Sequence, residues 1–146
     1  MIKIVGQNQI LEDISIQINA SRIKKEPFPH TIISGPSGHG KTTISKFIAE
    51  SMGGTFISLS GNEIQDRNDL SDQILWVKGG DIVFIDEIHC IGKKEGTIEA
   101  LYIVLEEFKL SGYIIPKFTC IGATTDISLL PQPLRDRFIL KYRLKS

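Results

Sequence analysis

The segment Gly35–Thr42, which reads GPSGHGKT, constrains the fold more than any other part of this chain. It satisfies the pattern G-x-x-x-x-G-K-[ST] between a short β-branched run, Thr31–Ser34, and an amphipathic stretch, Thr42–Ser51. Its glycines allow a tight turn whose backbone N–H groups point at phosphate oxygens, and the N-terminal end of the next helix adds positive potential there. A chance match to four fixed positions is expected only about once in 10⁴ to 10⁵ starting points. The segment therefore predicts a strand, a phosphate-binding loop and a helix in that order.

The residues at the end of this loop have defined chemical roles. Lys41 is expected to reach the β- and γ-phosphates of a nucleotide, and the hydroxyl of Thr42 is expected to hold Mg²⁺. His39 either contacts phosphate or is an exposed loop histidine. The other residues that we expect to bind the nucleotide are Gly35, Pro36, Ser37, Gly38, Gly40 and Thr43.

A pair of carboxylates after a second apolar run would complete such a site. Asp86 and Glu87 come directly after Ile82–Ile85, a continuous apolar run that is typical of a strand covered on both faces. Asp86 suits the outer coordination sphere of Mg²⁺, and Glu87 suits a base that orients or deprotonates the attacking water. A bound cation would also offset the repulsion between the two carboxylates. Such a strand end is common by itself, but together with Lys41 it predicts a site for nucleotide hydrolysis.

The rest of the chain alternates short apolar runs with amphipathic stretches. We expect helices over residues 7–20, 42–51, 66–77 and 97–109, and strands over residues 31–34, 55–58, 82–85, 118–123 and 138–144. Strands separated by helices predict an α/β fold, with a parallel sheet of about five strands flanked by helices. The 146 residues are expected to form a single domain, 1–146. Trp76, near the end of the third helix, is expected to fill the core.

Composition limits the partners. The chain has 17 Lys and Arg against 17 Asp and Glu and a pI of about 6.8, whereas strong nucleic-acid binders usually have a basic excess. Any contact with DNA is therefore expected to be weak or indirect. No apolar run is long enough to cross a bilayer and residues 1–6 lack the core of a signal peptide, so we expect a cytoplasmic protein without a membrane partner. Cys90 and Cys120 lack C-x-x-C spacing and are expected to be free thiols.

Three more motifs follow the phosphate loop, and their order resembles that of a known family. They read DEIH at 86–89, IGATT at 121–125 and PLRDRF at 133–138. In this combination the chain resembles the AAA+ ATPases, and within them the ATPase domain of the RuvB family of Holliday-junction branch-migration motors. The likeness begins near Ile4 and covers nearly the whole chain. It implies a P-loop NTPase fold of the AAA+ large-subdomain type, with ATP and Mg²⁺ as ligands.

The resemblance also implies roles for residues outside the loop. Ile4 and Val5, followed by Gly6, would lie beside the adenine. Thr125, with Thr124 second, matches the polar sensor that contacts the γ-phosphate or the attacking water. Capping of the strand end is the alternative interpretation of these two threonines.

Arg137 matches the arginine finger of the family, which reaches the nucleotide of a neighbouring subunit, and Arg135 is the second candidate. Such a cation can raise the hydrolysis rate by about 10³ to 10⁵ in P-loop enzymes. Hydrolysis would then require assembly into a homo-oligomeric ring, for which the resemblance implies a hexamer.

The chain departs from the family in three places. It has Ser37 and His39 where the family has a second proline and a leucine. Only residues 109–117 stand where the motor has a long β-hairpin that engages its partner RuvA, so docking of a RuvA-type partner is not favoured. The helical lid and the winged-helix domain of the family would follow Ser146, so we expect the nucleotide-binding core alone.

The expected function is that of an ATP-binding and ATP-hydrolysing core of a RuvB-like branch-migration helicase in DNA recombination and repair. Two alternatives remain open. One is a nucleotide switch resembling a clamp-loader subunit, which uses ATP to gate partner binding. The other is a fragment that binds nucleotide without hydrolysing it.

Overall fold

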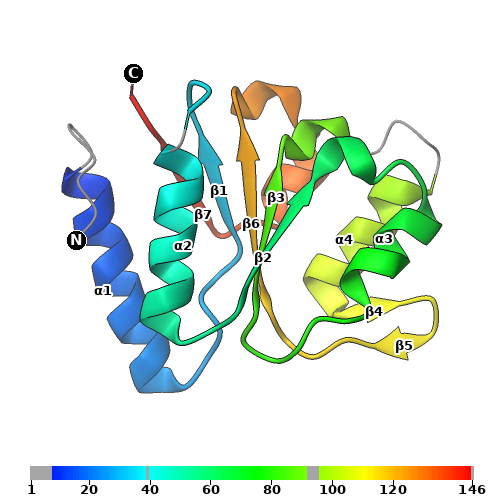
Figure 1. Cartoon of the computed structure of the whole chain (residues 1–146), viewed down its shortest axis with the longest axis horizontal. Helices are drawn as coiled ribbons and strands as arrows, with labels where there is room; N and C mark the ends of the chain where they lie inside the picture. Colours follow the sequence, from blue (N-terminus) through cyan, green and yellow to red (C-terminus); the bar gives the residue numbers. More distant parts are fainter. Residues whose placement is uncertain (1–7, 39, 92–95, 146) are drawn as a thin grey trace.

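The computed structural model of the chain describes residues 8–38, 40–91 and 96–145. Its main sheet has five strands in the order β2-β3-β6-β1-β7, and every neighbouring pair is parallel (Figure 1). The strands are β1 (Thr31–Ser34), β2 (Phe56–Ser60), β3 (Ile82–Asp86), β6 (Thr119–Thr124) and β7 (Leu140–Arg143). The expected α/β fold with a parallel, helix-flanked sheet is confirmed.

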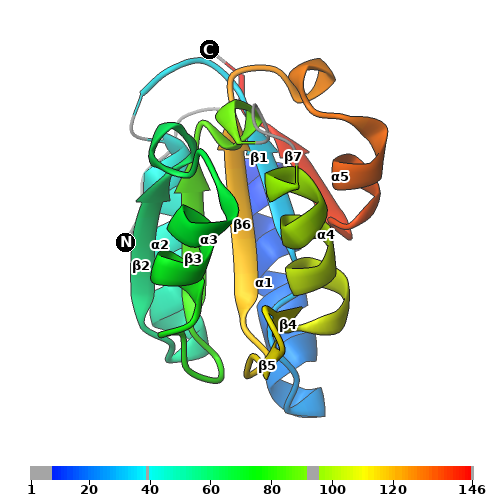
Figure 2. The same ribbon diagram turned by 90° about the vertical axis from the view of Figure 1, so that its right-hand side faces the viewer.

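Helices cover both faces of this sheet. Two helices, α1 (Asn8–Lys24) and α2 (Gly40–Met52), lie on one face, and α3 (Arg67–Ile74) and α4 (Thr97–Glu107) lie on the other (Figures 1 and 2). The short helix α5 (Gln132–Asp136) lies beside α4. The 3-10 helices are η1 (Gly61–Glu63), η2 (Ile88–Cys90) and η3 (Ile127–Leu129).

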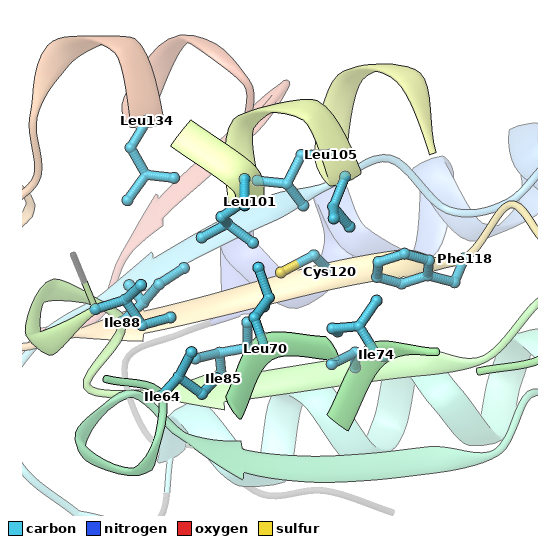
Figure 3. Packing of buried hydrophobic residues seen from close by; sticks show 14 of the residues in the cluster. Ile64, Leu70, Ile74, Ile85, Ile88, Leu101, Leu105, Phe118, Cys120 and Leu134 are labelled. Atoms are coloured by element: carbon cyan, nitrogen blue, oxygen red, sulfur yellow. The ribbon is translucent and has the colours of Figure 1, made fainter. Parts of the chain in front are cut away.

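The sheet is buried on both sides because side chains alternate along its strands. In β3, Ile82 and Phe84 pack with α1 and α2, whereas Val83 and Ile85 pack with α3 and α4. The core on the second side is the larger one, and Figure 3 shows its Ile85, Leu101 and Phe118 among the packed side chains. This packing fixes where each strand ends, and hence where the residues after each strand lie.

Most element boundaries agree with the sequence-based expectations, and the differences have local causes. The helix expected over 97–109 ends at Glu107 because Phe108 adopts a left-handed conformation, with φ of 54°. The chain then forms a small antiparallel hairpin of β4 (Lys109–Leu110) and β5 (Tyr113–Ile114). Helix α3 stops at Ile74, which leaves Trp76 outside the helix.

The expectation that Trp76 fills the core is wrong, since this side chain is 82% exposed. Cys120 is buried and Cys90 is half-buried, and both are free thiols as expected. Among the helices of the described residues, none has the length and apolar character needed to cross a membrane.

Candidate nucleotide site

The carboxyl ends of β1, β3 and β6 bring the sequence-predicted residues together. Ser34 is in register with Thr124, and Ser60 at the end of β2 is in register with Asp86. A cavity of about 90 Å³ lies at this edge. Its lining residues are Ser37, Gly38, Lys41, Asp86, Glu87, Thr124 and Thr125. In parallel α/β sheets this edge is where ligands bind.

The phosphate loop begins at a glycine that the packing requires. Gly35 has φ of +149° and donates its N–H to the carbonyl of Thr124, at 3.1 Å. A Cβ atom at this position would lie 3.0 Å from both the Cβ and the carbonyl oxygen of Leu144, which follows β7. Leu144 donates its own N–H to the carbonyl of Ser34, at 2.8 Å. The start of the loop is therefore clamped between the ends of β6 and β7.

Lys41 lies in the first turn of α2, and its side chain points back into the loop. Its Nζ donates to the carbonyls of Gly35 and Pro36, at 2.9 Å and 2.8 Å, and the residue is only 6% exposed. Burial lowers the pKa of this ammonium group below its usual value, and the nearby negative charge of Asp86 acts in the opposite direction. The ammonium is therefore a partly desolvated cation at the floor of the loop, where anionic phosphate would favour its charged form.

The two carboxylates after β3 have different surroundings. Asp86 accepts the backbone N–H of Glu87 at 2.9 Å, which fixes the orientation of its carboxylate. Glu87 has a left-handed backbone, with φ of 48° and ψ of 48°, a conformation that is uncommon for residues other than glycine. This turn separates the two side chains while both still line the cavity. Carboxylate and hydroxyl oxygens are suitable Mg²⁺ ligands, so Asp86 and Thr42 fit this ion chemically.

A residue that the sequence analysis did not select, Asn62, contacts Glu87. The side-chain amide of Asn62 in η1 donates to Oε2 of Glu87 at 2.5 Å. The approach is possible because Gly61 has no side chain: a Cβ there would lie 2.2 Å from the carbonyl oxygen of Glu87. The only hint in the sequence was position, since Gly61 and Asn62 directly follow β2, which pairs with β3, at the ligand-binding edge.

The end of β6 is held by a second side-chain network. The hydroxyl of Thr124 lies 3.0 Å from Nδ1 of His89 and donates to the carbonyl of Asp126 at 3.2 Å. Thr124 is buried, whereas Thr125 is exposed and also lines a second hollow of about 490 Å³. That hollow is also lined by Gly35, Pro36, Arg143, Leu144 and Lys145. Both threonines line the first cavity, but the hydroxyl of Thr124 is hydrogen-bonded at the strand end, whereas the side chain of Thr125 is exposed.

The other residues expected to bind the nucleotide are not among the described residues that line the cavity. Thr42 and Thr43 follow Lys41 in the first turn of α2 and are half-buried. The expected adenine-side residues Ile4, Val5 and Gly6, and the loop residue His39, lie outside the described residues.

Arg137 lies outside the cavity of its own chain. It is the C-cap of α5, and its guanidinium forms an ion pair with Glu106 of α4, with Nη2 and Oε2 3.3 Å apart. Arg135, the second candidate, lies two residues earlier, within α5, and is half-buried. Neither arginine is among the residues that line the cavity of this chain.

Comparison with known proteins identifies the family of this chain. Residues 1–144 match the family model described as the Holliday junction DNA helicase RuvB P-loop domain. The chain belongs to the RuvB family. It is 41% identical over 152 residues to the Holliday junction branch migration complex subunit RuvB of Rickettsia africae, and 38% identical over 153 residues to RuvB 1 of a Synechococcus strain.

Solved RuvB structures have the same fold. The Thermotoga maritima RuvB branch migration motor superposes with a TM-score of 0.87 at 34% identity, and a point variant of that protein with 0.90 at 33% identity. The match covers 95% of this chain and 45% of the Thermotoga motor chain, and 96% of this chain and 44% of the Rickettsia protein. This chain therefore spans less than half the length of these relatives.

Proposed function

We propose that this chain is the ATP-binding and ATP-hydrolysing core of a Holliday-junction branch-migration motor that works in DNA recombination and repair. The observation that carries the proposal is the cavity at the strand ends. Lys41 reaches it from the first turn of α2, Asp86 and Glu87 reach it from the end of β3, and Thr125 reaches it from the end of β6. Hydrolysis of a nucleoside triphosphate needs a cation for phosphate, an anion for the metal and a base for water, and these residues supply all three.

The loop and Lys41 fit the triphosphate of ATP. Phosphate oxygens would replace the carbonyls of Gly35 and Pro36 as acceptors for the Lys41 ammonium, because charge-assisted hydrogen bonds are stronger than neutral ones. Thr42 and Asp86 would hold Mg²⁺, and the ion would supply charge neutralisation between the β- and γ-phosphates. On the adenine side, Ile4 and Val5 are proposed contacts.

Glu87 is the proposed base, and Asn62 orients it. The exposed carboxylate of Glu87 can take or align a proton of water, while the amide of Asn62 fixes one of its two oxygens. Thr125, exposed at the end of β6, is the proposed γ-phosphate sensor. Because Gly35 and Thr124 share a backbone hydrogen bond, a shift of this strand end would be transmitted to the loop.

Arg137 is proposed to complete the site of a second copy of the chain. It lies outside the cavity of its own chain, and a guanidinium can stabilise the charge of the transferred phosphoryl group in trans. The active form is then a homo-oligomeric ring, proposed to be a hexamer. The balanced charge of the chain makes its own contact with DNA weak or indirect.

The same proposal covers domain limits, partners and location. Residues 1–146 form one nucleotide-binding core, and the motor acts in the cytoplasm, where ATP and DNA are available. The hairpin of β4 and β5 has only two residues in each strand. Docking of a RuvA-type partner through an extended hairpin is therefore not part of the proposed function.

The test separates nucleotide binding from hydrolysis. Lys41→Ala should abolish tight binding of Mg-ATP, measured by calorimetry, because it removes the buried cation of the loop. Glu87→Gln should retain binding and lower kcat by about 10² to 10⁴, the usual contribution of a general base. Lys46→Ala on the same helix and Glu63→Gln in η1 are exposed controls that should behave as the unmodified chain.

Two results would overturn the proposal. Unchanged affinity in Lys41→Ala would show that the loop does not bind phosphate. Tight binding by the unmodified chain, with no hydrolysis at any protein concentration, would favour the fragment that binds ATP without turnover.

A further inference from the structure

Three contacts within the chain hold the guanidinium of Arg137. Nη1 donates to the carbonyl of Pro133 at 2.8 Å, and Nη2 donates to Oε2 of Glu106 at 3.3 Å. The guanidinium carbon lies 4.5 Å from the centroid of the Tyr102 ring. The side chain of Arg137 is 25% exposed, so it is held at the surface and not buried in the core.

Tyr102 and Glu106 form a cradle because of their spacing on α4. Residues four apart on a helix lie on the same face, one turn from each other. The ring of Tyr102 lies under the guanidinium, and the carboxylate of Glu106 lies at its edge. Helix α5, whose C-cap is Arg137, lies beside α4 (Figure 2).

The two members of the cradle act on the guanidinium differently. The face of an aromatic ring attracts a cation without using a hydrogen-bond donor, so Tyr102 can keep hold of the group while its N–H groups bind elsewhere. The Nε atom of Arg137 is buried without a hydrogen-bond partner among the described residues, which fits a group lying flat on a ring. Glu106, in contrast, accepts a hydrogen bond from Nη2 of Arg137, and the side chain of Glu106 is 62% exposed. Exposed ion pairs are weak, so this contact can be exchanged.

We propose that Tyr102 and Glu106 are positioning residues for Arg137, with the ring as a permanent platform and the carboxylate as an exchangeable partner. When two copies meet, the phosphate of the neighbouring copy takes the place of Glu106 at Nη2, while Tyr102 keeps the guanidinium aimed. The inference rests on the proposed function, because it assumes that Arg137 acts on the nucleotide of a second copy. According to this proposal, side chains of α4 orient the guanidinium of Arg137, although no sequence motif lies on that helix.

The first test concerns the platform. Tyr102→Leu should lower the maximal specific rate of Mg-ATP hydrolysis, reached at high protein concentration, by about 3-fold to 30-fold. Tyr102→Phe retains the ring and should restore the rate to within about twofold. Tyr113→Leu on the hairpin is the control for loss of a tyrosine. If Tyr102→Leu does not fold, as judged by thermal unfolding, Tyr102→Met takes its place.

The second test concerns the exchangeable partner. Glu106→Gln should lower the protein concentration that gives half of the maximal rate by about 2-fold to 5-fold, with the maximal rate unchanged. The physical reason is that the guanidinium no longer has to leave a carboxylate before it binds phosphate. Glu107→Gln removes the same charge from the next position of α4. The contacts of Arg137 described above do not include Glu107, so this variant should have no effect.

Arg137→Ala distinguishes failure of this inference from failure of the proposed function. If Arg137→Ala leaves hydrolysis unchanged, the trans finger is wrong and the cradle has no role. If Arg137→Ala abolishes hydrolysis but Tyr102→Leu and Glu106→Gln match the unmodified chain, only the cradle is wrong. Equal losses in Tyr102→Leu and Tyr102→Phe would also overturn it, because the ring would then not be the determinant.

The double variant Arg137→Ala with Tyr102→Leu should be no slower than Arg137→Ala alone, since the ring acts through the arginine. A further loss of rate in the double variant would show that Tyr102 acts on the site by another route.

Discussion

At the scale of single residues, the most unusual feature of the site is the left-handed backbone of Glu87, the proposed base. A left-handed backbone conformation costs free energy for a residue other than glycine and persists only where the surroundings impose it. Here the carbonyl of Glu87 lies against Gly61, and its carboxylate accepts a hydrogen bond from Asn62. The ends of β2 and β3 therefore fix the position of the proposed base together.

Asn62→Ala tests this arrangement. We expect kcat for ATP to fall by about 3-fold to 30-fold, because a hydrogen bond to a charged group at a partly exposed site is lost. Affinity for Mg-ATP should be unchanged, since Asn62 does not line the cavity. Steady-state kinetics and calorimetry check the two expectations. Asn68→Ala, on the exposed side of α3, is the matched control, and an unchanged or increased kcat in Asn62→Ala would contradict the orienting role.

Some residues of the site could be predicted from the sequence and others could not. Lys41, Asp86 and Glu87 were predictable because each belongs to a contiguous motif beside a recognisable strand or helix. Asn62, Tyr102 and Glu106 act on residues that are distant in sequence, and only the packing of β2 on β3 and of α5 on α4 brings them close. No local pattern encodes such pairs.

At the scale of secondary-structure elements, His30, which directly precedes β1, forms hydrogen bonds with both β6 and α4. Its Nδ1 accepts the backbone N–H of Cys120 in β6 at 2.9 Å, and its Nε2 lies 3.0 Å from the carbonyl of Leu105 in α4. The ring also packs against Phe108 and Phe118. Both nitrogens are used only in the neutral form with the proton on Nε2, so protonation would cost one of these bonds.

This geometry predicts how stability depends on pH. Burial lowers the pKa of His30 below the ordinary value of 6.5, and the hydrogen bond to Leu105 opposes this only in part. The unfolded chain therefore binds a proton at higher pH than the folded chain does. The stabilisation is fully present above about pH 6.5 and is lost as the pH falls towards the lower folded value, by at most about 1.4 kcal/mol per pH unit.

Urea unfolding between pH 7.5 and pH 5 measures this effect. His30→Asn should lose free energy of unfolding at neutral pH but show a shallower decline on acidification than the unmodified chain. Parallel declines for the two proteins would show that His30 is not the group responsible.

The elements that the sequence analysis did not predict are the short ones. Helix α5 has five residues and β4 and β5 have two each, which is too short for a periodic pattern to emerge. The prediction for Trp76 was wrong because it extended the helical pattern past Ile74. In the structure α3 ends at Ile74, and the side chain of Trp76 is exposed to solvent. The five strands of the main sheet were recognisable from their apolar runs, and the expected bounds of β1 agree fully with the structure.

At the scale of the whole molecule, the residues proposed to form a composite site lie in two separate places on the chain. The phosphate loop and the carboxylates lie at the carboxyl edge of the sheet. Arg137 is the C-cap of α5, which lies beside α4 (Figure 2), and it pairs with Glu106 of α4. Within one copy, Arg137 is held by contacts with α4 and does not line the cavity. This placement is consistent with the proposed ring, in which each copy would supply Arg137 to the next through a heterologous interface.

The most direct measurement mixes two inactive variants of the chain, Glu87→Gln and Arg137→Ala, and follows Mg-ATP hydrolysis at a fixed total concentration. The first variant retains the finger and the second retains the base. A mixed interface therefore contains a complete site when the second variant supplies Glu87 and the first variant supplies Arg137. We predict that the specific rate of the mixture exceeds that of either variant alone and rises with total protein concentration. A mixture no more active than the two variants measured separately would contradict the shared site and the proposed ring.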